Sequence, residues 1–395
     1  MKKLILIICI SILKLSCYCQ DIIPVENAKV LSQKSKFNLK NKFGTGFRTF
    51  LLFDLSRPPI KEQPVINAKE KGRVIQMNLW YPTSISNSAK ISFKDYLILK
   101  GSETDSTLTE QQKEFLAKSI LAKNYNTTPD TITRLFKSNY QFKGIKNAPF
   151  LSLKFPLIVM LHNNPVGFAP LAEQLSSYGF VVVNFPVTGT SSKNFDWETI
   201  AGVETELRDM DFVVKEITRM GIIDSTCIIP LGYSYGAMAA LAYQIRNNNV
   251  KAIISLDGGI GSIWGGNLLF NLPDFNISKL KKPVFHAWSD LEEGYDHKWL
   301  GNYICCEKYL MKFSRLRHGD FAEGTIFEQI VPGITSKVSG KSVIGNEIEY
   351  KKLIESITWF ALWISTGDKS YERQFKNINL PYSKHTKWNC INNLT

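Results

Sequence analysis

Residues 232–236 read Gly232-Tyr233-Ser234-Tyr235-Gly236. This is the G-x-S-x-G pattern, which occurs where a strand turns sharply into a helix. An apolar run, 227–231, precedes the pattern, and small helix-forming residues, 237–242, follow it. Glycines two places on either side of the serine remove Cβ atoms that so tight a turn would bring into contact. The stretch therefore predicts a strand, a turn that exposes the Ser234 hydroxyl, and a helix. Ser234 is a candidate nucleophile, and the alternative is a serine with a purely structural role in a turn.

Pro230 conflicts with a central strand at this place, because proline donates no hydrogen bond to the sheet. Two interpretations remain open. The strand ends at Ile229, or a neighbouring strand leaves that position unpaired.

The sequence around this turn alternates between strand-like and helix-like segments. A helix is expected at 202–218, where apolar residues recur on one face, and a final helix at 350–365. Apolar strands that alternate with amphipathic helices predict an α/β fold, with a mostly parallel sheet covered by helices on both faces. The expected strands are 155–162, 179–185, 227–231, 251–257 and 283–288.

The segment before this region has a different character. Two strand-like runs, 47–53 and 73–81, come first, and Pro82 is expected to end the second. Residues 85 to about 150 are polar, with helices expected at 109–124 and 130–137. We interpret this segment as a helical insertion before the main sheet, which either caps a cleft or decorates the surface.

The first 19 residues have the features of a secretory signal peptide. Lys2-Lys3 precede a short apolar run, 4–13, and small residues stand before a cleavage point at Gln20. We expect an exported protein, periplasmic or secreted, with one domain over 20–395. The alternative is a lipoprotein anchored at Cys17. Cleavage removes three lysines, which lowers the net charge from +13 to about +10.

This positive charge is compatible with association with an anionic membrane surface. No run of five like charges and no basic stripe with interleaved aromatics occurs, so no nucleic-acid partner is expected. The oligomeric state is left open. Four cysteines follow the leader, too few for a disulfide scaffold, and pairing of Cys390 with Cys305 or Cys306 stays open.

A serine nucleophile needs a base, and a carboxylate usually orients that base. Five histidines occur, and four of them are poorly placed for a base. His162 precedes the serine in the chain, and His286 lies inside an apolar strand. His297 follows an acidic loop, and His385 lies in the polar C-terminal tail. His318 follows a late strand-like run and lies in a loop, as the base should. Asp257 and Asp290 each follow a strand, so either can supply the carboxylate by topology.

An oxyanion intermediate also needs N–H donors. One should be the N–H of Tyr235, directly after the serine. The second should come from the loop after the first main strand. Pro165 has no N–H, so Asn164 is the expected donor and Asn163 the alternative.

These residues together resemble the α/β-hydrolase superfamily, and within it the esterases similar to platelet-activating-factor acetylhydrolase and dienelactone hydrolase. The segments that carry the resemblance are Phe53-Asp54-Leu55-Ser56-Arg57-Pro58, Trp80-Tyr81-Pro82, Leu256-Asp257 and His318-Gly319-Asp320-Phe321-Ala322. The resemblance implies an α/β-hydrolase fold and favours Asp257 over Asp290. The chain departs from the usual His-Gly-x-Gly oxyanion loop at Asn163 and Pro165.

The expected function is that of an exported serine esterase, with Ser234 as nucleophile, His318 as base and Asp257 as orienting acid. The expected substrate is a small-molecule or lipid ester, and no metal or organic cofactor is implied. The alternatives are a peptidase or acyltransferase with the same three residues, and a non-enzymatic binding protein on the same scaffold.

Overall fold

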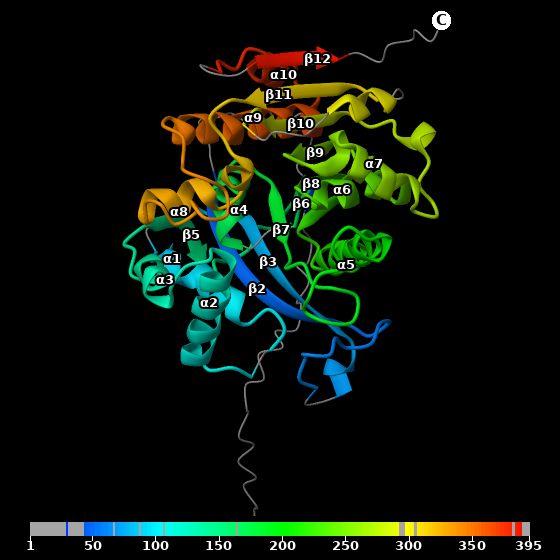
Figure 1. Ribbon diagram of the computed structural model, residues 1–395. Coiled ribbons are helices and arrows are strands. Elements are labelled where there is room, and N and C mark those ends of the chain that lie inside the picture. Colours follow the sequence, from blue (N-terminus) through cyan, green and yellow to red (C-terminus); the bar gives the residue numbers. More distant parts are fainter. Residues whose placement is uncertain are drawn as a thin grey trace, which may run out of the picture.

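A twisted sheet crosses the whole molecule, and helices pack on both of its faces (Figure 1). This computed structural model describes residues 29–30, 43–65, 68–86, 88–105, 107–162, 165–291, 297–303, 306–380 and 384–388. The expected signal peptide with Cys17 lies outside these residues. So do Asn163, Asn164, Cys305 and Cys390. Across the described ranges, none of the helices has the length and apolar character needed to cross a bilayer.

The strands follow the order β12-β11-β10-β9-β8-β6-β7-β3-β2-β5-β4, and β1 pairs with β6. Their bounds are β1 Lys29–Val30, β2 Gly44–Asp54, β3 Arg73–Thr83, β4 Lys90–Ser92, β5 Gln141–Lys146, β6 Leu153–Leu161, β7 Val181–Asn184, β8 Ile223–Tyr233, β9 Ile253–Leu256, β10 Val284–Ser289, β11 Lys308–Phe313 and β12 Lys384–Trp388. The run from β7 to β11 is parallel, whereas β2, β3 and β12 pair antiparallel with their neighbours β3, β7 and β11.

The helices are α1 Phe93–Leu97, α2 Glu110–Asn124, α3 Pro129–Phe136, α4 Pro165–Ser177, α5 Ile200–Arg219, α6 Gly236–Arg246, α7 Ile263–Phe270, α8 Gly324–Ile330, α9 Asn346–Thr366 and α10 Lys369–Lys376. Short 3-10 turns cover 68–71, 98–101, 259–261, 277–279, 297–302 and 318–321.

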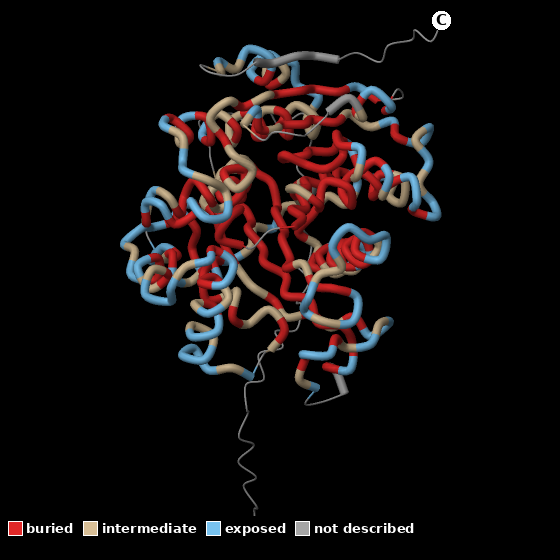
Figure 2. Tube along the Cα trace, in the orientation of Figure 1, coloured by how far each residue is buried: buried red, intermediate tan, exposed pale blue. Residues whose placement is uncertain are grey.

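Alternate residues of the central strands belong to two separate hydrophobic cores. Ile158 and Met160 of β6 pack in the core under α4 and α9, and Leu157 and Val159 pack in the core under α5 and α6. Successive side chains of a strand point to opposite faces, so a sheet covered on both sides needs an apolar residue at every position. Figure 2 shows the strands buried and the outer helix surfaces exposed.

The expected α/β architecture with a mostly parallel sheet is confirmed, and some boundaries differ. β3 continues through Pro82 to Thr83, because Pro82 lies opposite Thr45 at the end of the β2–β3 pairing. The segment 85–150 contains α2 and α3 as expected, but also β4 and β5, which the pattern did not predict. β5 pairs with β2 and extends the sheet. The helix expected to be final, α9, is followed by α10 and β12.

Pro230 lies inside β8, which runs on to Tyr233, so the strand does not end at Ile229. On the β9 side, an isolated bridge joins Ile228 to Val250, and regular pairing starts at Leu231 with Ile254. The register therefore slips by one residue opposite Pro230. Because of this slip, the pairing of β8 with β9 has no position that requires a hydrogen bond from the Pro230 nitrogen.

Candidate active site

The turn between β8 and α6 holds Ser234 in the left-handed region of backbone conformation, with φ of 52°. Few residues other than glycine adopt this conformation, and its cost must be met by the surrounding structure. The Ser234 N–H donates to the carbonyl of Leu256, and the Ser234 carbonyl accepts from the N–H of Gly259. Contacts from β9 and the loop after it therefore hold the strained turn in place.

The two glycines of the pattern stand where no side chain fits. A Cβ at Gly232 would lie 2.3 Å from the Gly236 carbonyl oxygen. A Cβ at Gly236 would lie 2.5 Å from the Cβ of His162. The turn thus needs glycine at both positions for close approach.

Three polar side chains from separate parts of the chain form a continuous hydrogen-bonded row. The Nε2 atom of His318 lies 3.0 Å from the Oγ of Ser234, and its Nδ1 lies 2.6 Å from the Oδ2 of Asp257. His318 opens the 3-10 turn that follows β11, and Asp257 follows the last residue of β9. All three residues stand at the carboxyl edge of the parallel strands.

Asp257 is itself firmly held. Its side chain is buried, its Oδ1 accepts from the N–H of Ser289 at 2.8 Å, and its own N–H donates to the carbonyl of Ala287. The imidazole of His318 stacks on the ring of Tyr233, with centroids 4.9 Å apart. Hydrogen bonds thus hold the Asp257 side chain, and ring packing holds the imidazole of His318.

The alternative carboxylate, Asp290, has a different partner. It lies 2.9 Å from the Nζ of Lys312, and 43% of its side chain is exposed. The structure therefore brings Asp257 to His318 and leaves Asp290 in a surface ion pair.

The other histidines have different surroundings. His286 is fully buried in β10 and its Nδ1 lies 2.8 Å from the Oγ of Ser255, as expected of a core histidine. His162 is buried directly after β6. The side chains of His297 and His385 lie outside the described part of the structure.

Of the expected oxyanion donors, only Tyr235 falls within the described residues. Among those residues its N–H has no hydrogen-bond acceptor. Asn163 and Asn164 lie outside the described residues. Pro165 is the first residue of α4, where proline is favoured because that N–H has no partner within the helix.

An aromatic cluster next to Ser234 was not predicted from the sequence. The ring of His162 lies 5.3 Å from Phe195, 5.0 Å from Trp197 and 5.4 Å from Tyr235, between centroids. Trp197 is 61% exposed and Tyr235 is buried. Residues 195–197 belong to the segment before α5, and their ring contacts with His162 and Tyr235 show that they approach the turn.

The 85–150 segment also reaches this edge of the molecule. A hollow of about 190 Å³ has Tyr125 and Glu323 in its lining, together with Tyr233 and Gly319, the neighbours of Ser234 and His318. The hydroxyl of Tyr125 donates to Glu323 at 2.6 Å. The 85–150 segment therefore contacts the region that follows His318.

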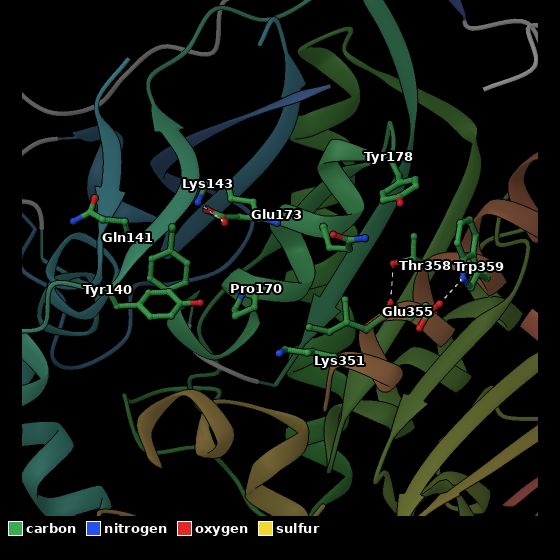
Figure 3. Close-up of a pocket in the computed structure, with 13 residues that line it drawn as sticks. Tyr140, Gln141, Lys143, Pro170, Glu173, Tyr178, Lys351, Glu355, Thr358 and Trp359 are labelled. Carbon is green, nitrogen blue, oxygen red and sulfur yellow. Dashed lines mark hydrogen bonds between the residues drawn. The ribbon is translucent and has the colours of Figure 1, made fainter. Parts of the chain in front are cut away.

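A second hollow, of about 420 Å³, lies between α4 and α9 and contains none of the three residues of the row (Figure 3). Its buried carboxylate, Glu173, accepts from the N–H groups of Lys143 and Gly144. Burial raises the pKa of Glu173 to about 7. Two backbone N–H groups thus already bind the oxygens of this carboxylate.

Over the described residues, no group of three or more His, Cys, Asp or Glu side chains is arranged to hold a metal ion. Cys227 is a buried free thiol, and Cys306 is buried with its Sγ 3.6 Å from the Tyr303 carbonyl oxygen.

A scan against protein-family models finds no match, and a search of curated proteins finds none either. Among solved structures, the chain is similar to a ferulic acid esterase from Streptomyces cinnamoneus, with a TM-score of 0.55. The two are 15% identical, and the match covers 90% of this chain and 95% of that one. This chain has the α/β-hydrolase fold. In the α/β-hydrolase fold the strand-to-helix turn carries a candidate nucleophile at the carboxyl edge of the sheet, which is where Ser234 stands.

Proposed function

We propose that this protein is a serine hydrolase that cleaves carboxylic esters through an acyl-enzyme on Ser234. The observation that carries the proposal is the row Ser234 Oγ, His318 Nε2, His318 Nδ1 and Asp257 Oδ2, with contacts of 3.0 and 2.6 Å. A serine hydroxyl, a base and an orienting carboxylate in this order are what nucleophilic acyl transfer requires.

In the proposed reaction, Nε2 of His318 takes the Ser234 proton as Oγ attacks the ester carbonyl. Asp257 accepts the hydrogen bond from Nδ1–H, so that Nε2 is free to act as the base. The same imidazole then protonates the leaving alcohol. Water attacks the acyl-enzyme in the second half of the reaction, and His318 again serves as base and then as acid.

The negative oxygen of the tetrahedral intermediate is proposed to bind the N–H of Tyr235. Asn164, or alternatively Asn163, is proposed as the second donor. Each donor of this kind contributes about 3–4 kcal/mol to the transition state. Tyr235 directly follows Ser234 in the strained turn, so its N–H is the backbone donor next to the proposed nucleophile.

The ester class of substrate is favoured by the name of the similar structure, a ferulic acid esterase. The motifs that resemble esterases of the platelet-activating-factor acetylhydrolase type favour the same class. We further propose that the protein is exported, from the features of residues 1–19, and that its substrate is a small-molecule or lipid ester.

The test compares the wild type with Ser234→Ala in hydrolysis of p-nitrophenyl acetate and p-nitrophenyl butyrate. We expect a loss of kcat of at least about 10³-fold, because the nucleophile is absent. The control is Ser119→Ala, an exposed serine of α2, which should keep full activity. Retained hydrolysis in Ser234→Ala contradicts the proposal.

A fluorophosphonate probe gives an independent measurement, because it labels an activated serine without the need for a matching substrate. Mass spectrometry should locate the adduct on Ser234 in the wild type and find none in Ser234→Ala. A wild type that hydrolyses no ester and takes no label points instead to a binding protein on this fold. Preferential transfer of the acyl group to an added amine points to an acyltransferase.

A further inference from the structure

Two buried polar side chains face each other behind the Ser234 turn. Nδ1 of His162 lies 3.8 Å from Oε1 of Glu206 on α5, and both side chains are more than nine-tenths buried. At that separation they do not form a hydrogen bond. Within the described part of the chain, neither this nitrogen nor either Glu206 oxygen has any hydrogen-bond partner. Buried polar groups are rarely left this way, so the pair calls for an explanation.

The position of His162 ties the pair to the turn. His162 directly follows β6 with φ of 69° and packs its Cβ against Gly236. Its ring also lies on the ring of Tyr235, whose N–H is the proposed oxyanion donor. In the sequence it directly precedes Asn163 and Asn164. Interactions that fix the position of His162 therefore also stabilise the Ser234 turn.

The charges around Glu206 indicate which of the two groups carries a proton. Arg57 and Arg73 both form ion pairs with Asp209, one helical turn after Glu206. The hydroxyl of Tyr235 donates to the Thr199 carbonyl and not to Glu206.

Burial, with a further contribution from the charge of Asp209, raises the pKa of Glu206 to about 8. Burial, with a further contribution from His318, lowers the pKa of His162 to about 3. Both groups are therefore uncharged at neutral pH. A carboxylic acid donates a hydrogen bond, and the unprotonated nitrogen of a neutral imidazole accepts one.

We propose that Glu206 is a positioning residue whose protonated carboxyl donates a hydrogen bond to Nδ1 of His162 and keeps the region behind the Ser234 turn uncharged. This inference rests on the proposed esterase function. Small movements of the two side chains bring Oε1 and Nδ1 within bonding distance. When Glu206 loses its proton to solvent at alkaline pH, a negative charge appears behind the Tyr235 N–H. That charge opposes the negative oxygen of the intermediate, so kcat should fall while KM changes little.

The test measures kcat and KM of the full chain with p-nitrophenyl acetate from pH 6 to 9.5, corrected for spontaneous hydrolysis. For the wild type we expect kcat to decline about tenfold with a midpoint near pH 8. Glu206→Gln keeps a donor to His162 and does not titrate. It should keep kcat at pH 7 within about threefold of the wild type and lose the alkaline decline. Glu206→Leu has no donor and should lower kcat at pH 7 about 10–100-fold.

Glu204→Gln is the matched control, since Glu204 lies on the same helix but pairs with Arg246 at the surface. It should keep the wild-type pH profile. The inference is wrong if Glu206→Gln shows the same alkaline decline as the wild type, or if it lowers kcat as much as Glu206→Leu. Should Glu206→Leu fail to fold, the pH profile of Glu206→Gln decides alone. If the proposed function itself is wrong, the wild type shows neither hydrolysis nor fluorophosphonate labelling, which is a different result.

Discussion

Gly236 has no room for a side chain, because β6 and His162 lie directly against it. The same is true of Gly232, whose missing Cβ would meet the backbone of the turn. The two glycines of the G-x-S-x-G pattern are therefore required for steric reasons. For this reason a pattern of five residues predicts the strand–turn–helix structure.

Gly236→Ala should destabilise the protein by about 1–3 kcal/mol, because its Cβ would lie 2.5 Å from the Cβ of His162 and something must shift. The measurement is urea unfolding followed by circular dichroism. Gly301→Ala is the matched control, since nothing lies within 4 Å of the position of its added Cβ. Equal stability of the two variants would show that the turn has space for a side chain.

Asp257 and Asp290 differ in their contacts, and a pair of isosteric substitutions separates their roles. Asp257→Asn should lower kcat about 10³–10⁴-fold, because the amide no longer orients the Nδ1–H of His318. Asp290→Asn removes only a surface ion pair with Lys312 and should leave kcat within about threefold of the wild type. Steady-state hydrolysis of a short p-nitrophenyl ester provides the measurement. A collapse of kcat in Asp290→Asn alone would reverse the assignment.

At the scale of elements, α5 connects the first strands to the turn. Arg73 of β3 and Arg57 after β2 both bind Asp209 on α5, and Arg57 also binds Asp54. The Phe-Asp-x-x-Arg-Pro segment of the sequence is thus part of a buried charge network. This network anchors the helix that carries Glu206.

Two hydrogen bonds join the 85–150 segment to the region after His318: the Tyr125 hydroxyl donates to Glu323, and the Nζ of Lys337 donates to the Asn126 carbonyl. Tyr125→Phe should lower the free energy of unfolding by about 1–3 kcal/mol, because the Glu323 carboxylate loses a donor from the buried Tyr125 side chain. Tyr140→Phe serves as the control, since the Tyr140 hydroxyl has no hydrogen-bond partner among the described residues. Chemical unfolding of both variants gives the comparison. If Tyr125→Phe is no less stable than Tyr140→Phe, the hydrogen bond from Tyr125 to Glu323 does not stabilise this contact.

At the scale of the whole molecule, buried acids make stability depend on pH. Burial raises the pKa of Glu206 from 4.5 to about 8, so folding keeps a proton that the unfolded chain releases. The stabilising contribution is complete below pH 4.5 and is lost as pH rises toward 8. The pKa of Glu173 is raised to about 7 and that of His162 is lowered to about 3, so these two groups change the stability mainly below pH 7. Between pH 7 and 8.5 Glu206 therefore makes the larger contribution of the two buried glutamates.

Between pH 7 and 8.5 the wild type should lose about 1–2 kcal/mol of stability through Glu206. Glu206→Gln should lose less over the same interval, because its amide does not titrate. Thermal unfolding at both pH values measures the difference, with exposed Glu110→Gln as the control. Identical pH dependence in wild type and Glu206→Gln would show that Glu206 does not carry its proton in the folded state.

Features that depend on residues close together in the chain could be predicted from the sequence. The turn at Ser234, the amphipathic helix α5, the apolar strands of the parallel sheet and the helices α2 and α3 all follow from local pattern. It also narrowed the base to His318 by position. It did not predict β4, β5, α10 or β12, because short or polar segments of this kind take their structure from the partners against which they pack.

Sequence topology allowed either carboxylate, the resemblance favoured Asp257, and the tertiary contacts bring Asp257 to His318. Asp257 and Asp290 both follow strands. The carboxylate of Asp257 is held by the N–H of Ser289 and that of Asp290 by the Nζ of Lys312, and both partners belong to later strands. The slip of register at Pro230, the aromatic cluster around Tyr235 and the meeting of His162 with Glu206 have the same origin. Each of these features brings together residues that are far apart in the sequence. Such contacts depend on how the helices pack on the sheet, and no local sequence pattern determines them.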